Sequence, residues 1–266
     1  MSPLRFEKFQ GLGNDFLIVD ARTSGALMSA STAITLCDRH RGVGGDGVIS
    51  LLPSRVPEAA LRMHIYNADG SVAEMCGNGL RCVVRAILGA SEAGSRVLVD
   101  TDAGLRSGEL LTGGQVRVSL GRARVVHERL EVEALGRRFL GTWVSMGNPH
   151  FVVDPSGEEP RELAERFGPV LERASAFPER SNIEFYRKKT DGSLELVVFE
   201  RGAGLTQACG TGAGATAFTA LRRGEVAGGS VTVHLPGGPL RVSAAGEEIF
   251  IEGDAAKVFE GSVQGL

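Results

Sequence analysis

Short segments in which apolar and polar residues alternate, separated by glycine-containing turns, recur along the whole chain. This alternation is the period of a half-buried β-strand, and many short strands with glycine turns are typical of antiparallel sheets. The stretch Thr190–Ser193, Thr-Asp-Gly-Ser, is predicted to be a hairpin turn between two such strands. The predicted strands cover residues 5–9, 16–20, 48–52, 62–66, 96–100 and 115–120 in the first half, and 139–145, 151–154, 181–187, 194–199, 231–234, 240–244 and 248–252 in the second.

Two segments, Leu80–Leu88 and Gly212–Leu221, are predicted to be buried helices. The first is apolar on nearly all faces and the second is rich in Ala and Thr, which is the pattern of a helix without a solvent-facing side. Gly89 and Gly224 follow these segments as C-terminal stops. Weaker helical patterns cover residues 33–39 and 161–172.

Two pairs of motifs repeat at almost the same interval. Met75–Leu80 (MCGNGL) resembles Ala208–Ala213 (ACGTGA), and the two cysteines are 133 residues apart. Gly13–Asp20 (GNDFLIVD) resembles Gly147–Asp154 (GNPHFVVD) at an interval of 134 residues. One interval close to half of the 266 residues indicates a duplicated domain of common size.

The duplication and the predicted elements together define a fold class. We expect an α+β protein made of two pseudo-symmetric domains, each a mostly antiparallel sheet wrapped around one central buried helix. The predicted domains are residues 1–121, which carry Cys76, and residues 122–266, which carry Cys209. We expect the last few residues to pack back on the N-terminal half.

Composition and charge argue against several classes of function. The net charge of −3 lacks the basic excess of a nucleic-acid-binding protein. The longest apolar runs, such as Leu17–Val19, are too short to cross a bilayer, and the first residues lack the apolar segment of a signal peptide. We therefore expect a cytoplasmic protein without a membrane or nucleic-acid partner.

The four cysteines divide into two kinds. No CxxC pair occurs and the spacing from Cys76 to Cys82 is a poor one for zinc, so we expect no metal site. Cys37 and Cys82 are predicted to be small core residues. Cys76 and Cys209 instead stand directly before the two central helices, with glycines on the helical side in both repeats.

A cysteine at a helix N-terminus lies in the partial positive charge of the first N–H groups, which lowers a thiol pKa from about 8.5 to roughly 3.5–7.5. Glycines leave the same N–H groups accessible to a carboxylate. One thiolate and one thiol facing each other across a shared cleft would remove a proton from one side of an α-carbon and return one to the other, inverting the centre. Fixed amide dipoles in a dry site could stabilise the transition state without a cofactor.

Cofactor motifs do not match the chain. No lysine stands in a recognisable pyridoxal-phosphate context and no GxGxxG follows a strand. The glycine-rich run Gly42–Gly47 lacks the Lys-Ser/Thr of a phosphate loop. We expect no cofactor.

Five motifs, in order from about residue 6 to the C-terminus, resemble those of the diaminopimelate epimerase family. The strongest are the two cysteine signatures, in which Glu200 and Asn67 each stand nine residues before their cysteine. The motifs are Gly11–Phe16, Asn67–Ser71 with Glu74–Cys82, Met146–His150, Glu179–Asn182, and Glu200–Gly204 with Thr206–Gly212.

The resemblance implies a pyridoxal-phosphate-independent epimerase that converts LL-2,6-diaminopimelate to the meso form, on the route to lysine and bacterial cell wall, often as a homodimer. It implies that Cys76 and Cys209 are the acid and base, with Glu200 beside the reacting ammonium and His150 supporting the thiol chemistry. Arg201 suits a distal carboxylate, which a guanidinium fork matches in a bidentate manner. By the same resemblance the amides of Gly77, Asn78, Gly210 and Thr211 hold the reacting carboxylate, and Asn14, Asn67, Asn148, Asn182 and Arg201 hold the other polar groups.

Three positions depart from the usual family pattern: Gly47, Val72 and Leu205. They keep open a racemase of another amino acid on the same scaffold. A thiol-redox or metal-binding protein is a more remote alternative, which the lack of CxxC and of clustered histidines disfavours. A non-catalytic binding module would require one of the two thiols to be missing or blocked.

Overall fold

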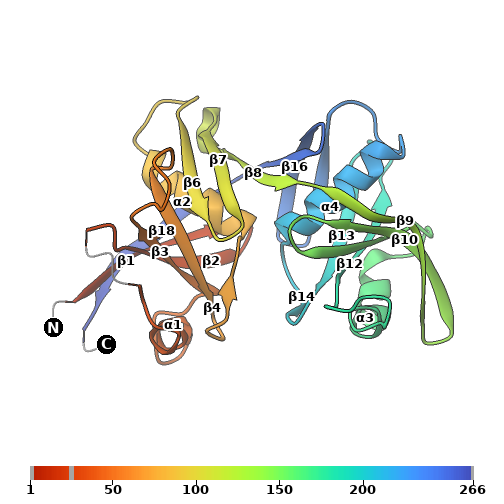
Figure 1. Ribbon diagram of the computed structural model, residues 1–266, viewed down its shortest axis with the longest axis horizontal. Coiled ribbons are helices and arrows are strands. Elements are labelled where there is room, and N and C mark those ends of the chain that lie inside the picture. The colour runs from red at the N-terminus through yellow and green to blue at the C-terminus, as the bar shows by residue number, and fades with distance from the viewer. Residues whose placement is uncertain (1–2, 24–26, 265–266) are drawn as a thin grey trace. The chain divides into compact units, whose positions relative to one another are not determined.

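The computed structural model describes residues 3–23 and 27–264, and divides the chain into two compact units (Figure 1). Unit 1 runs from the N-terminus to Val118 and resumes at Gly253, and unit 2 is Ser119–Glu252. The predicted division after residue 121 thus differs from the observed one by a few residues. The C-terminal strand belongs to unit 1, because it pairs with the first strand of the chain.

Unit 1 is a mainly antiparallel sheet around one helix. Its strands follow the spatial order β18-β1-β2-β3-β4-β6-β7-β8, and among these pairings of described residues only β2–β3 and β4–β6 are parallel. The elements are β1 (Leu4–Gly11), β2 (Asn14–Asp20), α1 (Ala30–Cys37), β3 (Gly47–Leu52), β4 (Leu61–Asn67), β5 (Val72–Ala73), α2 (Gly77–Leu88), β6 (Arg96–Thr101), β7 (Gly104–Leu110), a 3-10 turn (Thr112–Gly114), the start of β8 (Val116–Arg122) and β18 (Ala256–Val263).

Unit 2 repeats this architecture. Its strand order is β9-β10-β11-β12-β13-β15-β16-β17, and the parallel pairs β11–β12 and β13–β15 fall at the same two places. The identical sequence of strand directions establishes the pseudo-symmetry expected from the repeats. The elements are β9 (Arg124–Ala134), β10 (Arg137–Ser145), β11 (Pro149–Val153), α3 (Pro160–Leu171), β12 (Asn182–Lys188), β13 (Leu194–Glu200), β14 (Gly204–Leu205), α4 (Gly210–Arg222), β15 (Ser230–Leu235), β16 (Gly238–Ala245) and β17 (Glu248–Gly253).

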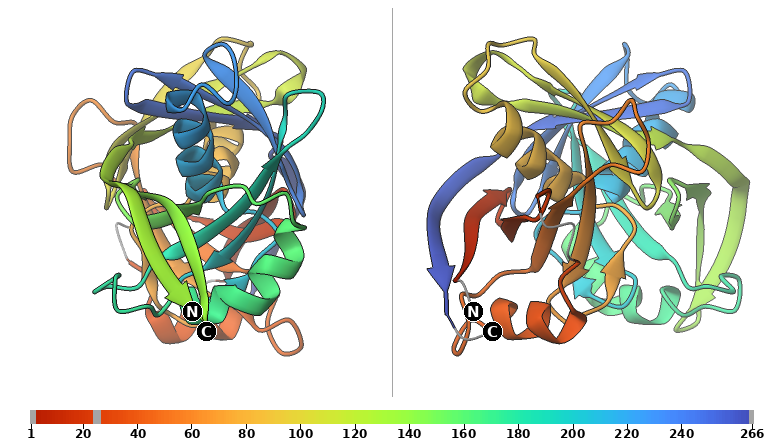
Figure 2. Two further views of the ribbon diagram at one scale, coloured as in Figure 1. Left: turned by 90° about the vertical axis from the view of Figure 1, so that its right-hand side faces the viewer. Right: turned by 60° about the vertical axis from the view of Figure 1, so that its left-hand side comes forward.

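Each unit has a central helix that its own strands surround. Helix α2 contacts β1, β2, β6, β7 and β18, and α4 contacts β10 to β13, β15 and β16 (Figure 2). Leu80, Val83 and Val84 of α2 have no exposed surface. In α4, a Cβ on Gly214 would lie 3.0 Å from Leu120 and 3.2 Å from Ile249, so a small residue lets the strands approach the helix.

Helix α4 ends as its sequence predicts. Gly224 has φ +68°, its N–H donates to the Leu221 carbonyl at 3.1 Å, and the Glu225 N–H donates to the Ala220 carbonyl at 3.0 Å. This pair of bonds is a Schellman cap, which requires the left-handed conformation that glycine adopts without strain.

The sequence missed the strands whose side chains face solvent. Strand β9 is mostly exposed and carries charges at Arg124, Glu128, Arg129 and Glu131, so its polar face hides the alternation. Strand β18 is likewise exposed over most of its length. The helix predicted at residues 33–39 begins earlier, at Ala30, because the Ser29 side chain caps the Thr32 N–H. The hairpin at residues 190–193 is confirmed by the bond from Lys189 N–H to the Ser193 carbonyl, 2.8 Å.

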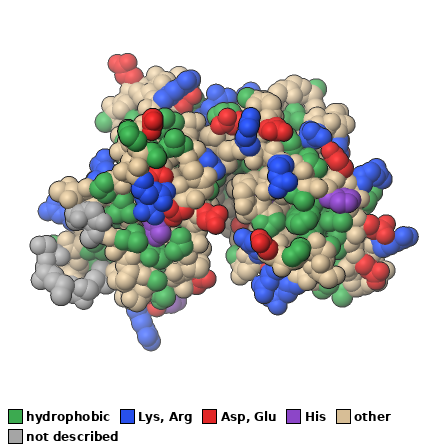
Figure 3. All heavy atoms as spheres, in the orientation of Figure 1, with side chains coloured by type: hydrophobic (Ala, Val, Ile, Leu, Met, Phe, Trp, Pro, Cys, Tyr) green, Lys and Arg blue, Asp and Glu red, His purple; other side chains and the backbone are tan. Residues whose placement is uncertain are grey.

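Charged side chains of both signs are visible on the face drawn in Figure 3. On the face drawn in Figure 3, the coloured Lys and Arg side chains lie among Asp and Glu side chains in each unit. None of the helices within residues 3–23 and 27–264 is long and apolar enough to cross a membrane.

Cys37 and Cys82 are buried in unit 1, as predicted, and burial raises the pKa of their thiols, to about 11 and about 12. A group whose folded pKa exceeds its unfolded value stabilises the fold below the unfolded pKa, here 9.0, and this stabilisation is lost as the pH rises through the folded value. We expect the free energy of unfolding, measured with urea, to fall between pH 9 and pH 11 and to fall less in Cys82→Ala. An equal fall in both proteins would contradict this assignment.

Candidate active site

Cys76 is the N-cap residue of α2. Its backbone is extended, its carbonyl accepts from the Leu80 N–H at 2.8 Å, and its sulfur accepts from the Gly79 N–H at 3.4 Å. The N-terminal end of a helix favours negative charge on a capping group. A Cβ on Gly79 would lie 3.0 Å from Ile49 Cδ1, so glycine lets β3 lie directly against the first turn.

Two asparagines lie beside Cys76. The thiol faces Asn14 Oδ1 at 3.9 Å, and Asn78 Nδ2 donates to the same oxygen at 3.2 Å. Asn14 Nδ2 donates to Asp46 Oδ2 at 2.8 Å, which sets the orientation of the Asn14 amide. Behind them, the fully buried Arg81 donates to Asn78 Oδ1 at 3.0 Å. The predicted residues Asn14, Cys76 and Asn78 therefore form one cluster.

Asn67 lies at the end of β4 and its contacts are local. Its amide donates to Ser71 Oγ at 3.0 Å, and its backbone N–H donates to the Ser71 carbonyl at 2.8 Å. Gly70, at φ +81°, closes the turn. The side chain is thus held in its own turn rather than by the Cys76 cluster.

Cys209 is the N-cap residue of α4 and is buried. Its sulfur lies 3.7 Å from Thr211 Oγ1, and Asn148 Nδ2 donates to that hydroxyl at 3.4 Å. His150 Nε2 lies 2.9 Å from Asn148 Oδ1. Strand β11 and helix α4 thereby bring the predicted residues Asn148, His150 and Thr211 together with the second cysteine.

Glu200, at the end of β13, faces the same sulfur. Its carboxylate accepts from Thr206 Oγ1 and from the Cys209 thiol. Burial raises the pKa of Glu200, while these two hydrogen bonds and the charge of His150 act in the opposite direction. Glu200 therefore belongs to the Cys209 cluster.

Asn182 and Arg201 form a separate contact in unit 2. Asn182 Oδ1 accepts from the Arg201 backbone N–H at 2.9 Å, and its Nδ2 donates to the Pro149 carbonyl at 2.8 Å. The Arg201 guanidinium is exposed and donates to the Glu179 carbonyl at 3.2 Å. The Asn182 side chain thus links the backbone at Arg201 to the backbone at Pro149. The guanidinium of Arg201 lies at the surface of its unit.

The expectation of a lowered thiol pKa is wrong for Cys209. Its pKa is raised well above 9.0, first by burial and then by the negative charges of Glu200 and Glu184. The Gly212 amide and the Thr211 hydroxyl oppose this but do not outweigh it. A helix N-terminus acts within its first turn, whereas desolvation and two close carboxylates penalise a thiolate more strongly. Cys209 is accordingly a protonated thiol near neutral pH.

Sequence reasoning missed two buried charged residues beside the cysteines. Glu184 is fully buried on β12, and its Oε1 lies 2.6 Å from His150 Nδ1. Arg81 is fully buried within α2. One signal was present for each: Glu184 stands between the apolar Ile183 and Phe185 of a predicted strand, and Arg81 stands between Leu80 and Cys82 of a helix predicted to be buried.

The glycines of the second repeat make room for that carboxyl. A Cβ on Gly212 would lie 3.0 Å from Glu184 Oε1 and 3.3 Å from Cys209 Sγ. The matching Gly79 instead faces the apolar Ile49. The equivalent glycines thus leave space for a carboxyl group in unit 2 and for an apolar side chain in unit 1.

Of the three positions that depart from the family pattern, one is packed tightly against backbone and two are exposed. A Cβ on Gly47 would lie 2.7 Å from the Tyr66 carbonyl, so the observed backbone accepts only glycine there. Val72 and Leu205 occupy equivalent two-residue strands, β5 and β14, with exposed fractions of 50% and 38%.

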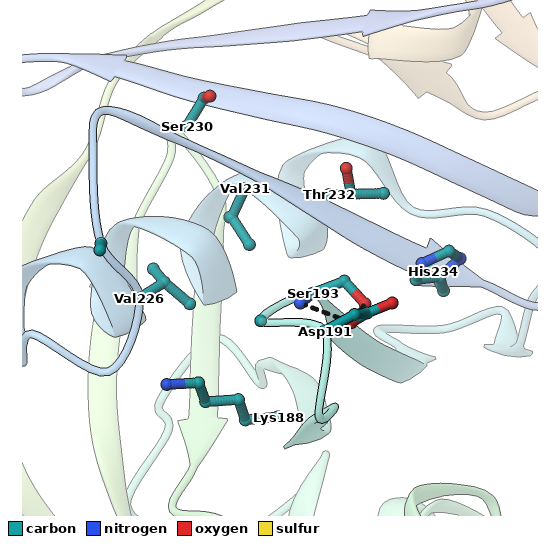
Figure 4. A pocket seen from close by; sticks show the side chains of 10 residues that line it. Lys188, Asp191, Ser193, Val226, Ser230, Val231, Thr232 and His234 are labelled. Atoms are coloured by element: carbon teal, nitrogen blue, oxygen red, sulfur yellow. Dashed lines mark hydrogen bonds between the residues drawn. The ribbon is translucent and has the colours of Figure 1, made fainter.

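A cavity of about 520 Å³ in unit 2 lies away from these residues, between the β12–β13 hairpin and β15 (Figure 4). Asp191, Ser193 and His234 line it, and Asp191 accepts from the Ser193 N–H at 2.9 Å. None of the predicted site residues belongs to its lining. Within the described residues, no three His, Cys, Asp or Glu side chains gather in a way that could hold a metal ion.

The raised pKa of Cys209 generates a prediction about its reactivity. In Glu200→Gln a negative charge next to the sulfur is removed, so the Cys209 pKa falls and more thiolate is present at pH 8. We expect iodoacetamide to alkylate Cys209 several-fold faster in this variant, as followed by peptide mass spectrometry. Cys37, in the other unit, serves as the internal reference. An unchanged Cys209 rate would show that Glu200 does not act on this thiol.

Known proteins resemble the chain along almost its whole length. The family model for diaminopimelate epimerase matches residues 6–126 and 142–258. A diaminopimelate epimerase from Thermosynechococcus vestitus is 41% identical over 285 residues, which cover 98% of this chain and 99% of that protein. One from Carboxydothermus hydrogenoformans is 39% identical over 274 residues, covering 97% and 98%.

Solved structures share the fold at lower identity. A hydroxyproline epimerase from Agrobacterium vitis superposes with a TM-score of 0.73 at 17% identity, covering 99% of this chain and 91% of that one. A PhzF-family phenazine biosynthesis protein from Bacillus anthracis gives 0.73 at 17%, covering 99% of each. These likenesses concern the fold alone. Since the family model matches both repeats and the sequence relatives extend over both units, the chain belongs to the diaminopimelate epimerase family.

Proposed function

We propose that this protein epimerises LL-2,6-diaminopimelate to the meso isomer, with two cysteine side chains as acid and base and with no cofactor. One observation carries the proposal: in a chain of this family, each pseudo-symmetric unit places a cysteine at the N-cap of its central helix, beside a polar cluster. The proposed site uses both cysteines on a single α-carbon.

The proton bookkeeping of the reaction follows from the state of Cys209. As a protonated thiol, Cys209 is the donor in one direction, and Cys76 is then the base. The α-carbon–hydrogen bond breaks as a Cys76 S–H bond forms, and the Cys209 S–H bond breaks as a new carbon–hydrogen bond forms on the opposite face. The centre inverts and the two thiols have exchanged protonation states, so they exchange roles in the reverse direction.

Stabilisation of the carbanion-like transition state falls to the helix ends. The first-turn amides of Gly77, Asn78, Gly210 and Thr211 would bind the reacting α-carboxylate, on which negative charge grows as the proton leaves. Preorganised amides of this kind need no rearrangement during the reaction.

Recognition of the substrate's other groups is assigned to the remaining polar residues. Glu200 would accept the reacting ammonium, whose positive charge favours the ionised carboxylate. Arg201 would release the Glu179 carbonyl and bind the distal carboxylate in a bidentate manner. Asn14, Asn67, Asn148 and Asn182 would hold the distal amino group and orient the chain of the substrate. A cytoplasmic location and the pairing of two copies stay predictions.

Substitution of either site cysteine tests the proposal. We expect Cys76→Ala and Cys209→Ala each to lower kcat for conversion of LL-diaminopimelate to the meso isomer by at least about a hundredfold, the usual scale for a lost general acid or base. Cys37→Ala, which changes a core thiol, is the matched control and should keep the wild-type rate. Product is measured by chiral chromatography, with other amino acids as alternative substrates. Near wild-type turnover by either site variant would rule out the two-thiol scheme, and faster conversion of another amino acid would redirect the substrate assignment.

A further inference from the structure

The two pseudo-symmetric units differ in chemistry directly behind their cysteine helices. In unit 1, Phe16 of β2 pairs with Gly47 of β3, and Ile49 lies two residues further along. In unit 2, His150 of β11 pairs in the same register with Asn182 of β12, and Glu184 lies two residues further along. His150 and Glu184 therefore stand where unit 1 has Phe16 and Ile49.

Packing alone does not account for the ionisable pair. Unit 1 shows that an apolar pair fills the equivalent space, because Phe16 and Ile49 are both buried there. His150 and Glu184 each have no exposed surface, and buried ionisable groups cost free energy unless they are fully hydrogen-bonded. Within the described residues, Glu184 Oε2 has no hydrogen-bond partner. Packing and stability therefore leave the presence of this pair in unit 2 unexplained.

The contacts of the pair fix where one hydrogen lies. Either protonated Glu184 donates to a neutral His150 at Nδ1, or the Glu184 carboxylate accepts from an imidazolium, across the same 2.6 Å contact. A third arrangement, in which a neutral His150 donates from Nδ1 to the Glu184 carboxylate, would leave Nε2 without a hydrogen. Nε2 would then face the acceptor oxygen Asn148 Oδ1 at 2.9 Å, so the Asn148 contact excludes it. In the two arrangements that remain, His150 Nε2 carries a hydrogen. Burial raises the pKa of Glu184, which favours the first arrangement, while the charge of His150 acts in the opposite direction.

The hydrogen on His150 Nε2 is the first of a series of hydrogen bonds in which each residue donates to the next, toward Cys209. His150 Nε2 donates to Asn148 Oδ1 at 2.9 Å, which turns the amide nitrogen toward Thr211 Oγ1 at 3.4 Å. Since the Thr211 oxygen accepts from Asn148, its own hydrogen is left to point at Cys209 Sγ, 3.7 Å away. Hydrogen bonds aligned in this way polarise one another. The chain ends on the sulfur that becomes a thiolate after proton donation.

We propose that Glu184 is a positioning residue for Cys209: through His150, Asn148 and Thr211 it holds a line of hydrogen-bond donors on the sulfur and so stabilises the thiolate that forms when the thiol gives its proton to substrate. The inference rests on the proposed function. Besides His150, the titratable groups that face Glu184 are Glu200 of β13 and Cys209 of α4. No residue of unit 1 takes part in this chain of donors.

The primary test is Glu184→Gln, which keeps the shape of the side chain. An amide can meet His150 Nδ1 either as donor or as acceptor, so it no longer fixes the hydrogen on Nε2. We expect kcat for LL-diaminopimelate to fall by roughly tenfold to a hundredfold, the scale seen when the partner that orients a functional histidine is lost. KM should change by less than about threefold, because Glu184 touches no substrate. The control Glu195→Gln, on the neighbouring β13 beside Arg187, should leave both constants unchanged.

A spectroscopic readout separates this role from a merely structural one. Imidazole ¹⁵N NMR of histidine-labelled protein should show His150 protonated at Nε2 in the wild type, and as a mixture of tautomers in Glu184→Gln. Thr211→Val removes the last donor without changing the buried pair, and Thr211→Ser restores it. We expect Thr211→Val to lower kcat, Thr211→Ser to recover most of it, and the Glu184→Gln/Thr211→Val double variant to cost little more than Thr211→Val alone.

Wild-type kcat in Glu184→Gln with His150 still protonated at Nε2 would overturn the inference. If Glu184→Gln fails to fold, the Thr211 pair decides: equal rates for Thr211→Val and Thr211→Ser would overturn it, and recovery by serine would support it. A wild-type protein inactive on LL-diaminopimelate would instead refute the proposed function. In that case the tautomer of His150 in the two proteins still tests whether Glu184 positions the histidine.

Discussion

A cysteine sulfur at the first turn of a buried helix is the arrangement on which the rest of the structure depends. The helix must be central, so that its N-terminal end lies inside the unit, and a sheet must therefore wrap around it. The same first turn must also carry a glycine, because Gly79 and Gly212 have neighbours about 3 Å from where a Cβ would lie. The first turn of each central helix is held by the surrounding sheet. One parallel pair of strands in each unit, β2–β3 and β11–β12, lies beside it, and small residues of α4 let the strands pack closely.

Duplication supplies this arrangement twice, but the two copies have diverged in electrostatics. Cys76 lies among asparagine amides, with Arg81 buried behind them. Cys209 lies among Thr211, Glu200 and Glu184, and its thiol keeps its proton. A symmetric fold thus provides two sulfurs in similar positions within their units, and beside Cys209 the negative charges of Glu200 and Glu184 add to burial in raising the thiol pKa. A two-base reaction needs one thiolate and one thiol at the start of each turnover, and a protonated Cys209 supplies the thiol in one direction.

Much of this could be predicted from sequence because the signals were local or repeated. Helices α2 and α4 were predicted within a few residues of their observed bounds, since an apolar helix ending in glycine leaves a strong pattern. The equivalence of Asn14 with Asn148, and of Cys76 with Cys209, followed from the nearly equal intervals of 134 and 133 residues between the repeats. Strands β9 and β18 were missed because exposed strands carry few apolar residues.

The sign of the Cys209 pKa shift could not be predicted for a different physical reason. It depends first on burial and then on Glu200 and Glu184, which lie 9 and 25 residues before Cys209 in the chain and come close to its sulfur only in the folded unit. The partial charge of the helix end, considered alone, predicts a lowered Cys209 pKa because it leaves out these two carboxylates and the burial of the thiol. Glu184 itself was overlooked because a single acidic residue between apolar neighbours belongs to no motif, and only its distance to His150 shows which residue it acts on.

The central claim, two opposed thiols acting on one carbon, is tested most directly by isotope incorporation early in the reaction. Wild-type protein is incubated with LL-diaminopimelate in D₂O, stopped after a few per cent conversion, and both isomers are analysed by mass spectrometry. The account predicts deuterium at the inverted α-carbon of the meso product and almost none in the remaining LL substrate, because the proton removed and the proton delivered belong to different sulfurs. Equal deuterium in substrate and product would indicate a single base serving both faces and would contradict the account.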